Sequence, residues 1–229
     1  MRINKLLSNY GVCSRKEANS IIEKGRVIVN GEVSFPGQWV EESDNILLDG
    51  EALKPKKKIY IALNKPIGIT CTAAKEVKDN IIKYMELENY IFPVGRLDKP
   101  SQGLILMTND GDLANDILES ENHHEKEYIV TVHKTIDNEF ISNMAEGVDI
   151  GETITRPCIV TKVNENTFRI ILTQGLNRQI RRMAKVFGYN VIRLERIRIM
   201  NIKLEDIEYG KWRNLTDKEV ETLRKLTSK

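Results

Sequence analysis

The sequence has few of the residues that build disulfide frameworks or metal sites. Its 229 residues include three cysteines, which lie far apart and never as a C-x-x-C pair. They are Cys13, Cys71 and Cys158. This pattern argues against a disulfide framework or a zinc ribbon and favours a reducing, cytoplasmic environment. His123, His124 and His133 have no cysteine or acid at ligand spacing, so we expect them at the surface and expect no metal site.

The sequence also lacks a long apolar run. No stretch approaches the roughly 20 apolar residues that cross a bilayer, and residues 1–11 contain no secretory apolar region. We therefore expect no membrane association. The apolar fraction of 41% is enough for a real core, and 30% charged residues suit a soluble surface.

Positive charge is concentrated in one segment, although the net formal charge of the chain is only +2. Between Gly175 and Met200, seven basic residues stand against one acid, Glu195. The seven are Arg178, Arg181, Arg182, Lys185, Arg193, Arg196 and Arg198. A polyanionic partner at this segment is therefore a reasonable hypothesis.

Residues 1–53 have the pattern of a self-contained module of two helices and two hairpins. Apolar residues at helical spacing predict a short first helix. Ser14 and Glu17 have the spacing of a capping box, which predicts the start of a second helix. The Asn-Gly pair at 30–31 and the Asp-Gly pair at 49–50 follow short apolar runs and predict tight hairpin turns.

Residues 54–58, with four lysines and one proline, separate this module from the rest of the chain. Because nothing in the segment can pack, we interpret it as an interdomain linker. A solvated charge run is the simple interpretation, and tracking along RNA would be an additional role.

Residues 59–229 mix strand-like and helical segments without regular alternation. The strand-like segments are 59–63, 103–108, 128–133, 168–173 and 196–202, and helical patterns lie near 77–87, 112–119, 137–146, 177–187 and 216–226. This order predicts an α+β domain built on a mostly antiparallel sheet.

Asp98 is a candidate catalytic carboxylate. It lies between Arg96 and Lys99 in a turn rich in glycine and proline, just before the apolar strand at 103–108. Such a turn can hold a carboxylate rigidly at a cleft. Ordinary turn chemistry also explains an aspartate in this position, and spacing alone does not separate the two.

The basic segment contains an amphipathic helix. Arg178, Arg181, Arg182 and Lys185 fall on one helical face, with apolar residues on the opposite face. Four like charges repel one another and no acid in the segment relieves them, which favours a phosphate partner over a merely solvated face. Asn177 is the expected cap of this helix.

Tyr128 has two possible roles. It shares one strand face with Val130 and Val132, so ordinary core packing is its default interpretation. Alternatively, it stacks on a base and offers its phenol to a reaction.

Three ordered motifs resemble those of one enzyme family, the RsuA family of bacterial ribosomal RNA pseudouridine synthases. The motifs are residues 95–111, 126–128 and 175–183. Residues 14–18 and 25–31 are similar to the alpha-L RNA-binding module that these enzymes usually carry. Together the matches cover nearly the whole chain in the expected order.

The resemblance implies three catalytic residues. The essential nucleophile of the family corresponds to Asp98, and the tyrosine that stacks on the target base corresponds to Tyr128. A basic residue of the third motif pairs with the aspartate, and both Arg181, the better match, and Arg178 remain candidates. The residues expected to bind substrate are Arg15, Lys16, Arg96, Asn177, Arg178, Gln179, Arg182 and Lys185. The sequence departs from the family pattern at Pro100, Ser101 and Leu176.

The resemblance also implies the reaction, which is isomerisation of a uridine to pseudouridine in ribosomal RNA. Large-subunit RNA is the expected substrate, either free or within a ribosomal particle, and the enzyme is expected to be a monomer. The bond from C1′ to N1 breaks, the uracil turns, and C5 rejoins the sugar, so no cofactor is expected. A carboxylate can act by adding to the base or by trapping the anomeric carbon, and both routes stay open.

Two other functions agree with parts of the sequence. A non-catalytic ribosome assembly protein would use the same basic surfaces, but it gives Asp98 no purpose. A hydrolase acting on sugars would need a second acid, for which Asp110 and Asp112 are the available candidates.

Overall fold

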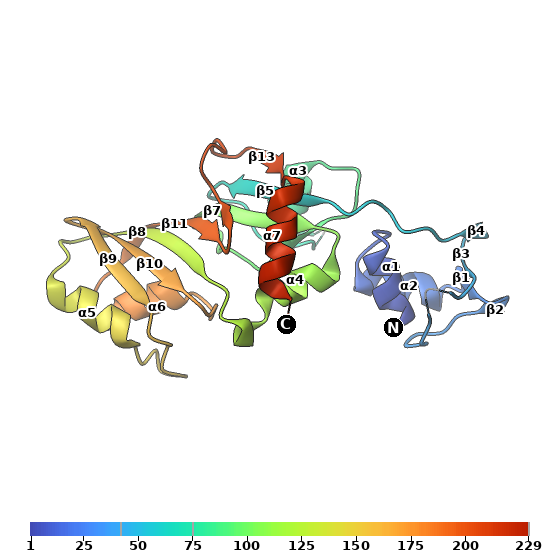
Figure 1. Ribbon diagram of the computed structural model, residues 1–229, viewed down its shortest axis with the longest axis horizontal. Coiled ribbons are helices and arrows are strands. Elements are labelled where there is room, and N and C mark those ends of the chain that lie inside the picture. Colours follow the sequence, from blue (N-terminus) through green and yellow to red (C-terminus); the bar gives the residue numbers. More distant parts are fainter. Residues whose placement is uncertain (42, 75, 229) are drawn as a thin grey trace.

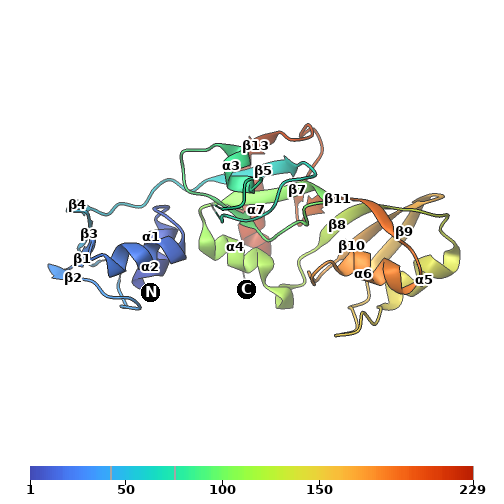
Figure 2. The same ribbon diagram turned by 180° about the vertical axis from the view of Figure 1, so that it is seen from behind.

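The computed structural model describes residues 1–41, 43–74 and 76–228. Figure 1 shows three regions in a row along the long axis of the molecule. The N-terminal module lies at one end, a central region carries the C-terminal helix, and a second lobe lies at the far end. Figure 2 shows the same order from behind.

The N-terminal module contains two helices and a small antiparallel sheet. The helices are α1 (Ile3–Asn9) and α2 (Arg15–Glu23), and the strands are β1 (Val27–Val29), β2 (Glu32–Val33), β3 (Ile46–Leu48) and β4 (Glu51–Ala52). The strands pair in the order β2-β1-β3-β4. The capping box of Ser14 and Glu17 is confirmed. Asn30 and Gly31 have φ values of 51° and 88°, which are the positive values that a type I′ hairpin requires.

The segment after the module, residues 54–58, is largely exposed, and two hydrogen bonds join it to the end of α1. The Lys56 amide donates to the Tyr10 carbonyl at 3.0 Å, and Lys58 Nζ donates to the Asn9 carbonyl at 2.8 Å. Both carbonyls lie at the end of α1, where a helix leaves its last acceptors unpaired. The segment therefore supplies hydrogen-bond donors to the unpaired carbonyls at the C-terminal end of α1.

The module also contacts the rest of the chain directly. Lys5 of α1 forms an ion pair with Asp112 at 2.8 Å, and Asn9 Nδ2 donates to the same carboxylate at 3.1 Å. These contacts are polar and exposed, so each stabilises the arrangement only slightly.

A nine-stranded sheet forms the frame of the remaining chain. Its strands are β5 (Tyr60–Lys65), β6 (Phe92–Val94), β7 (Gln102–Thr108), β8 (Lys126–Val132), β9 (Ile159–Asn164), β10 (Thr167–Leu172), β11 (Val191–Ile199), β12 (Ile202–Lys203) and β13 (Trp212–Asn214). The main path is β13-β5-β7-β11-β8-β10-β9, with β6 beside β7 and β12 beside β11. Among the described strands only β7 and β11 pair in parallel, which confirms an α+β fold on a mostly antiparallel sheet.

Helices cover both faces of this sheet. They are α3 (Ile81–Met85), α4 (Gly111–Leu118), α5 (Asn138–Glu146), α6 (Gln179–Val186) and α7 (Asp217–Thr227), with a short 3-10 turn, η1 (Ser120–Asn122). Alternate residues of a strand point to opposite faces. Ile61 and Ile105 therefore belong to one core cluster, which also includes residues of α3, α5 and α6, whereas Ala62 and Leu104 belong to a second cluster with residues of α4 and α7.

Several expectations differ from the observed fold. The strands β6, β9 and β13 were not predicted, and β11 begins at Val191 instead of residue 196. His124, which precedes β8, was expected at the surface but is only 8% exposed. Within the described residues, none of the helices is long and apolar enough to span a membrane.

Gly103 allows β7 and β11 to approach each other closely. Its φ is +102°, and a Cβ atom there would lie 2.3 Å from the Arg196 carbonyl oxygen. No larger side chain fits at this position. The parallel junction has two register pairs, Glu195 with Gln102 and Arg196 with Gly103. It places the end of the Asp98 turn beside Arg196.

Candidate active site

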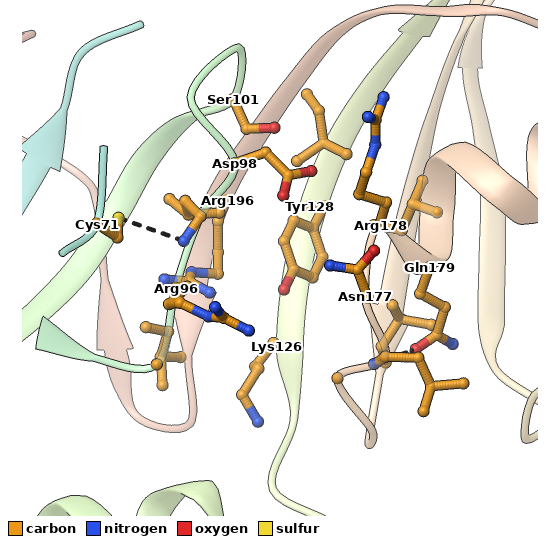
Figure 3. A pocket seen from close by; sticks show the side chains of 18 of the residues that line it. Cys71, Arg96, Asp98, Ser101, Lys126, Tyr128, Asn177, Arg178, Gln179 and Arg196 are labelled. Carbon is orange, nitrogen blue, oxygen red and sulfur yellow. Dashed lines mark hydrogen bonds between the residues drawn. The ribbon is translucent and has the colours of Figure 1, made fainter. Parts of the chain in front are cut away.

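A pocket of about 690 Å³ opens beside Asp98. Its walls come from the turn after β6, the start of β8, the loop before α6 with the first turn of α6, and β11. Figure 3 shows side chains of these elements converging on one space. The segments are distant in sequence, so the pocket exists only in the folded chain.

The turn between β6 and β7 fixes Asp98 on the pocket wall. The Ser101 amide donates to the Asp98 carbonyl at 2.9 Å, which closes the turn. Leu97 is 7% exposed, and its amide donates to Cys71 Sγ at 3.4 Å (Figure 3). The Asp98 side chain itself remains 35% exposed. The backbone on both sides is thus anchored while the carboxylate stays accessible.

Arg181 ties this turn to the neighbouring strand. Its Nε lies 3.9 Å from Asp98 Oδ2, its Nη1 donates to the Val191 carbonyl at 3.0 Å, and its Nη2 donates to Ser101 Oγ at 3.1 Å and the Pro100 carbonyl at 3.4 Å. Burial lowers the pKa of the Arg181 guanidinium, and the charge of Asp98 opposes that shift. Two residues that depart from the family pattern, Pro100 and Ser101, are therefore direct partners of Arg181.

Of the two arginines that remained candidates, Arg181 forms the contact with Asp98. Arg178 is exposed at the pocket, and its side chain points away from Arg96 in Figure 3. Nε of Arg181 is buried and has no hydrogen-bond partner. The negative charge of the Asp98 carboxylate, 3.9 Å away, therefore offsets part of the cost of this unpaired donor.

Tyr128 is part of the core and also part of the pocket wall. It belongs to the buried core with Val130 and Val132, and it is 8% exposed. It also lines the pocket, where Figure 3 shows its ring between Asp98 and the side chains of Arg96 and Lys126. A ring that is packed on one side and open on the other is a rigid platform for a planar base.

The start of α6 differs from the expectation. Asn177 was expected to cap the helix, but the cap position is held by Arg178 in the left-handed region, with φ of 48° and no side-chain cap. Gln179, an expected substrate contact, is 4% exposed. Its Oε1 accepts from the Leu176 amide at 3.1 Å and its Nε2 donates to Met183 Sδ at 3.7 Å. Its amide therefore holds the loop instead of facing the solvent.

The outer face of α6 is partly neutralised, contrary to the expectation that no acid relieves its charge. Arg182 Nη1 lies 3.4 Å from Glu152, and its Nη2 donates to the Ile150 carbonyl at 2.7 Å. Glu152 lies outside the basic segment, which is why the sequence did not reveal it. Lys185 is exposed, one turn further along the helix.

The remaining basic residues do not form one continuous positive surface. Arg193 pairs with Glu195 at 2.9 Å, and Arg198 pairs with Glu127 at 2.6 Å. Arg196 is 3% exposed and lines the pocket. The charge available to a polyanion is therefore concentrated at the pocket and the outer face of α6.

Three expected contact residues are exposed at different places. Arg96 projects into the pocket beside Tyr128 (Figure 3). Arg15 and Lys16 are exposed in the first turn of α2, on the N-terminal module and outside the pocket lining.

Three cations of the pocket lining, Lys99, Lys126 and Arg196, were not identified as site residues from the sequence. Lys126 lies two residues before Tyr128, so strand periodicity places it on the same face. Arg196 was counted only as part of the basic segment, and no local signal indicates its burial. Its position opposite Tyr128 in the sheet depends on long-range pairing.

The two acids considered for a hydrolase are engaged elsewhere. Asp110 accepts from Tyr60 at 2.8 Å and pairs with Arg224 at 2.7 Å, while Asp112 pairs with Lys5. Over the described parts of the chain, no group of three or more His, Cys, Asp or Glu could hold a metal ion. Among the described residues that line the pocket, Asp98 is thus the one carboxylate, and cations surround it.

Comparisons with known proteins agree with this arrangement. A family described as RNA pseudouridylate synthase matches residues 59–185, and the S4 domain family matches residues 1–46. The chain is 50% identical to the dual-specificity RNA pseudouridine synthase RluF of Salmonella typhi, over 98% of this chain and 79% of that protein. It is 31% identical to the ribosomal large subunit pseudouridine synthase B of Bacillus subtilis, over 98% of this chain and 96% of that protein. A crystal structure of a pseudouridylate synthase superimposes with a TM-score of 0.71 and 27% identity, covering 97% of this chain and 99% of the other. The chain therefore belongs to the RNA pseudouridylate synthase family and carries an S4 domain at its N-terminus.

Proposed function

We propose that this protein isomerises a specific uridine of ribosomal RNA to pseudouridine and that Asp98 is its catalytic carboxylate. The observation that carries the proposal is the position of Asp98, which lies on the wall of the pocket beside the ring of Tyr128 and within 3.9 Å of Arg181. A uracil stacked on Tyr128 would meet this carboxylate at its edge.

The chemistry requires only groups that the pocket holds. The target nucleotide leaves its stack and enters the pocket, where Tyr128 supports the base. Asp98 then adds to the base or traps the anomeric carbon, and Arg181 keeps the carboxylate ionised and aimed. Since the leaving uracil must rejoin the same sugar, a pocket that limits water access protects the intermediate.

Exposed cations are the proposed phosphate contacts. On the catalytic part these are Arg96, Arg178 and Lys185, with Arg182 as a partial contributor because Glu152 and Ile150 already engage it. We assign Asn177 to the wall of the entrance and Gln179 to positioning of the loop.

The N-terminal module is proposed to bind RNA away from the pocket. Residues 1–53 would act as this module, through Arg15 and Lys16, residues 54–58 as the connection, and residues 59–229 as the catalytic domain. The separate core of the module, formed by residues such as Leu6, Ile22 and Val29, supports this division.

The proposed substrate is large-subunit ribosomal RNA, free or within a ribosomal particle, in keeping with the name of the Bacillus subtilis relative. We further propose that the enzyme acts as a monomer in the cytoplasm. A single chain carries all the residues proposed here for catalysis.

The test is tritium release from ribosomal RNA labelled at uridine C5. Asp98→Asn keeps the size of the side chain and removes the nucleophilic anion, so we expect no detectable release with folding and RNA affinity nearly intact. Asp206→Asn, an exposed aspartate outside the pocket lining, is the matched control and should retain full activity. If Asp98→Asn keeps a tenth of wild-type turnover, the catalytic assignment is wrong, and a wild-type protein that binds RNA without release would indicate a non-catalytic assembly role.

A further inference from the structure

Arg196 has a buried charge without an acidic partner. Its side chain is 3% exposed, and its Nε donates to the Leu104 carbonyl at 2.7 Å. Its Nη2 is shielded from solvent and has no hydrogen-bond partner, although Arg196 lines the pocket. Leaving such a donor unpaired costs about 1–3 kcal/mol, more for a charged group, so a partner is expected from outside the chain.

Lys126 adds a second cation to the same part of the pocket. It is half-buried on β8, and its Nζ donates weakly to the His124 carbonyl at 3.4 Å. Burial, followed by the nearby charge of Arg196, lowers the pKa of Lys126 to about 8. The two side chains therefore repel each other across adjacent strands, and that repulsion disappears when an anion lies between them.

The surroundings do not compensate these charges. The charged or titratable groups around Lys126 and Arg196 are Lys65 of β5, Cys71, Arg96 and Asp98 of the neighbouring loops, His124, Tyr128 of β8 and Asp116 of α4, which faces His124. Asp98 already lies against Arg181. Lys65 is fully buried and donates only to the carbonyls of Pro66 and Ile69, which leaves its positive charge in place.

We propose, on the basis of the function above, that Arg196 and Lys126 form an anion subsite that binds the oxygen-bearing edge of the uracil ring while it carries negative charge. Figure 3 shows the phenol end of Tyr128 directed toward Arg96 and Lys126, with Asp98 at the other side of the ring. A base stacked on Tyr128 thus meets the carboxylate at one edge and the cations at the opposite edge.

Both routes open to Asp98 place negative charge on the ring. If the carboxylate adds to C6, its oxygen forms the new bond and the C5–C6 π pair moves onto the O4 carbonyl. If the C1′–N1 bond breaks first, its electron pair stays with the uracil and spreads over O2 and O4, while the carboxylate bonds to C1′. In the first route the C1′–N1 bond breaks after the addition. In either route C5 then bonds to C1′, the carboxylate leaves, N1 takes up a proton, and the C5 proton passes to solvent. Fixed cations that face this charge stabilise the negatively charged transition state more than they stabilise the neutral uridine of the ground state.

A phosphate in this position fits the arrangement less well. Lys126 and Arg196 stand on sheet strands of the pocket wall, whereas the exposed Arg178 lies at the start of α6 and the exposed Lys185 lies further along this helix, outside the pocket lining. A phosphate contact stabilises the ground state and the transition state equally, so its loss weakens binding and leaves the chemical step unchanged. Loss of a cation that binds the charged uracil should instead slow the chemical step.

The test compares Lys126→Met, Lys126→Arg and wild type by single-turnover tritium release at saturating RNA, with RNA affinity measured separately. Lys126→Met keeps the length of the side chain and removes its charge, and we expect a rate about 100-fold lower with RNA affinity within threefold of wild type. The control is Lys225→Met, an exposed lysine on α7 that pairs with Glu221, and its rate should not change. Thermal unfolding verifies that the variants are folded.

The pH profile provides a readout that a structural role would not change. With a pKa of about 8, Lys126 is mostly charged at pH 7 and about one-tenth charged at pH 9, so the wild-type rate should fall about tenfold over this range. Lys126→Arg keeps its charge and should lose this decline. In Arg196→Lys, the single ammonium group cannot both donate to the Leu104 carbonyl and reach the pocket. A folded variant should therefore also have a lower rate.

Two outcomes overturn the inference while leaving the proposed function intact. One is a Lys126→Met rate above one-third of wild type with an unchanged pH profile. The other is weaker RNA binding with a shallower salt dependence and an unchanged rate, which would assign the cations to a phosphate. A wild-type protein that releases no tritium from any ribosomal RNA would overturn the proposed function, and this inference with it.

Discussion

Replacing Arg181 by alanine should slow the chemical step without much loss of RNA affinity. The change removes the charge beside Asp98 and also releases the Ser101 hydroxyl and the Pro100 and Val191 carbonyls that Arg181 now engages. The turn that carries Asp98 then loses the contacts through which Arg181 joins it to β11. Because this connection acts on a protein group and not on the RNA backbone, the loss should be seen in the rate at saturating RNA.

The magnitude follows from the geometry of the pair. Two unit charges 3.9 Å apart interact with about 2.8 kcal/mol at an effective dielectric constant of about 30. We use a value above that for a buried pair because the Asp98 side chain is 35% exposed and water screens it. A loss of this size corresponds to about a 100-fold lower rate.

Single-turnover tritium release from ribosomal RNA, combined with equilibrium binding, measures both quantities. Arg181→Lys serves as a partial control, since it keeps the charge but not the forked contacts, and it should retain more activity than Arg181→Ala. Arg178→Ala should weaken binding and leave the saturated rate within threefold. If Arg178→Ala loses rate while Arg181→Ala loses only affinity, the positioning role belongs to Arg178 and the reasoning is refuted.

Three further predictions concern the rest of the molecule. Deleting residues 1–55 should leave a chain that unfolds cooperatively but binds ribosomal RNA at least tenfold more weakly, and failure to fold would contradict the separate cores. Lys185→Ala should weaken RNA binding and reduce its salt dependence by about one counterion, whereas Arg182→Ala should also lower the melting temperature because the Ile150 carbonyl loses its hydrogen-bond donor. Hydrogen bonds from Arg213 lower the pKa of Glu219 from 4.5 to about 2, so the pair stabilises the fold above pH 4.5 and this stability is lost as the pH falls toward 2. Glu219→Gln should therefore lower the free energy of unfolding by about 1–2 kcal/mol at pH 7, a difference that disappears in acid and would be pH-independent if the ion pair were irrelevant.

Local signals in the sequence predicted local structure well. The capping box at Ser14 formed because it joins a side chain to a backbone amide three residues away. The Asn-Gly and Asp-Gly turns formed because few other residues tolerate positive φ twice in succession. In contrast, β13 has only three residues at the sheet edge, and nothing in its own sequence indicates that β5 will pair with it.

The candidate site was predictable only in part. The carboxylate at Asp98 and the tyrosine at 128 lie in short motifs, so the sequence could place them. The burial of Arg196 could not be read from its neighbours, because it results from pairing with β8 and β7. Arg178 entered the left-handed region at the helix start, where propensity had favoured Asn177, because the surrounding loop and Gln179 fix the entry of the chain into α6.

The parallel junction at Gly103 has a consequence for the order in which the molecule folds. The Arg196 side chain and the Leu104 carbonyl, which form a hydrogen bond across it, are 92 residues apart in the chain. Closing this junction therefore costs more chain entropy than closing a local hairpin. Hairpins such as β9 with β10 can form beforehand from nearby residues. The turn with Asp98 and the helix with Arg181 meet only when the two halves of the sheet join. Catalytic competence should therefore appear in the last cooperative step of refolding, so that partly folded chains bind RNA without modifying it.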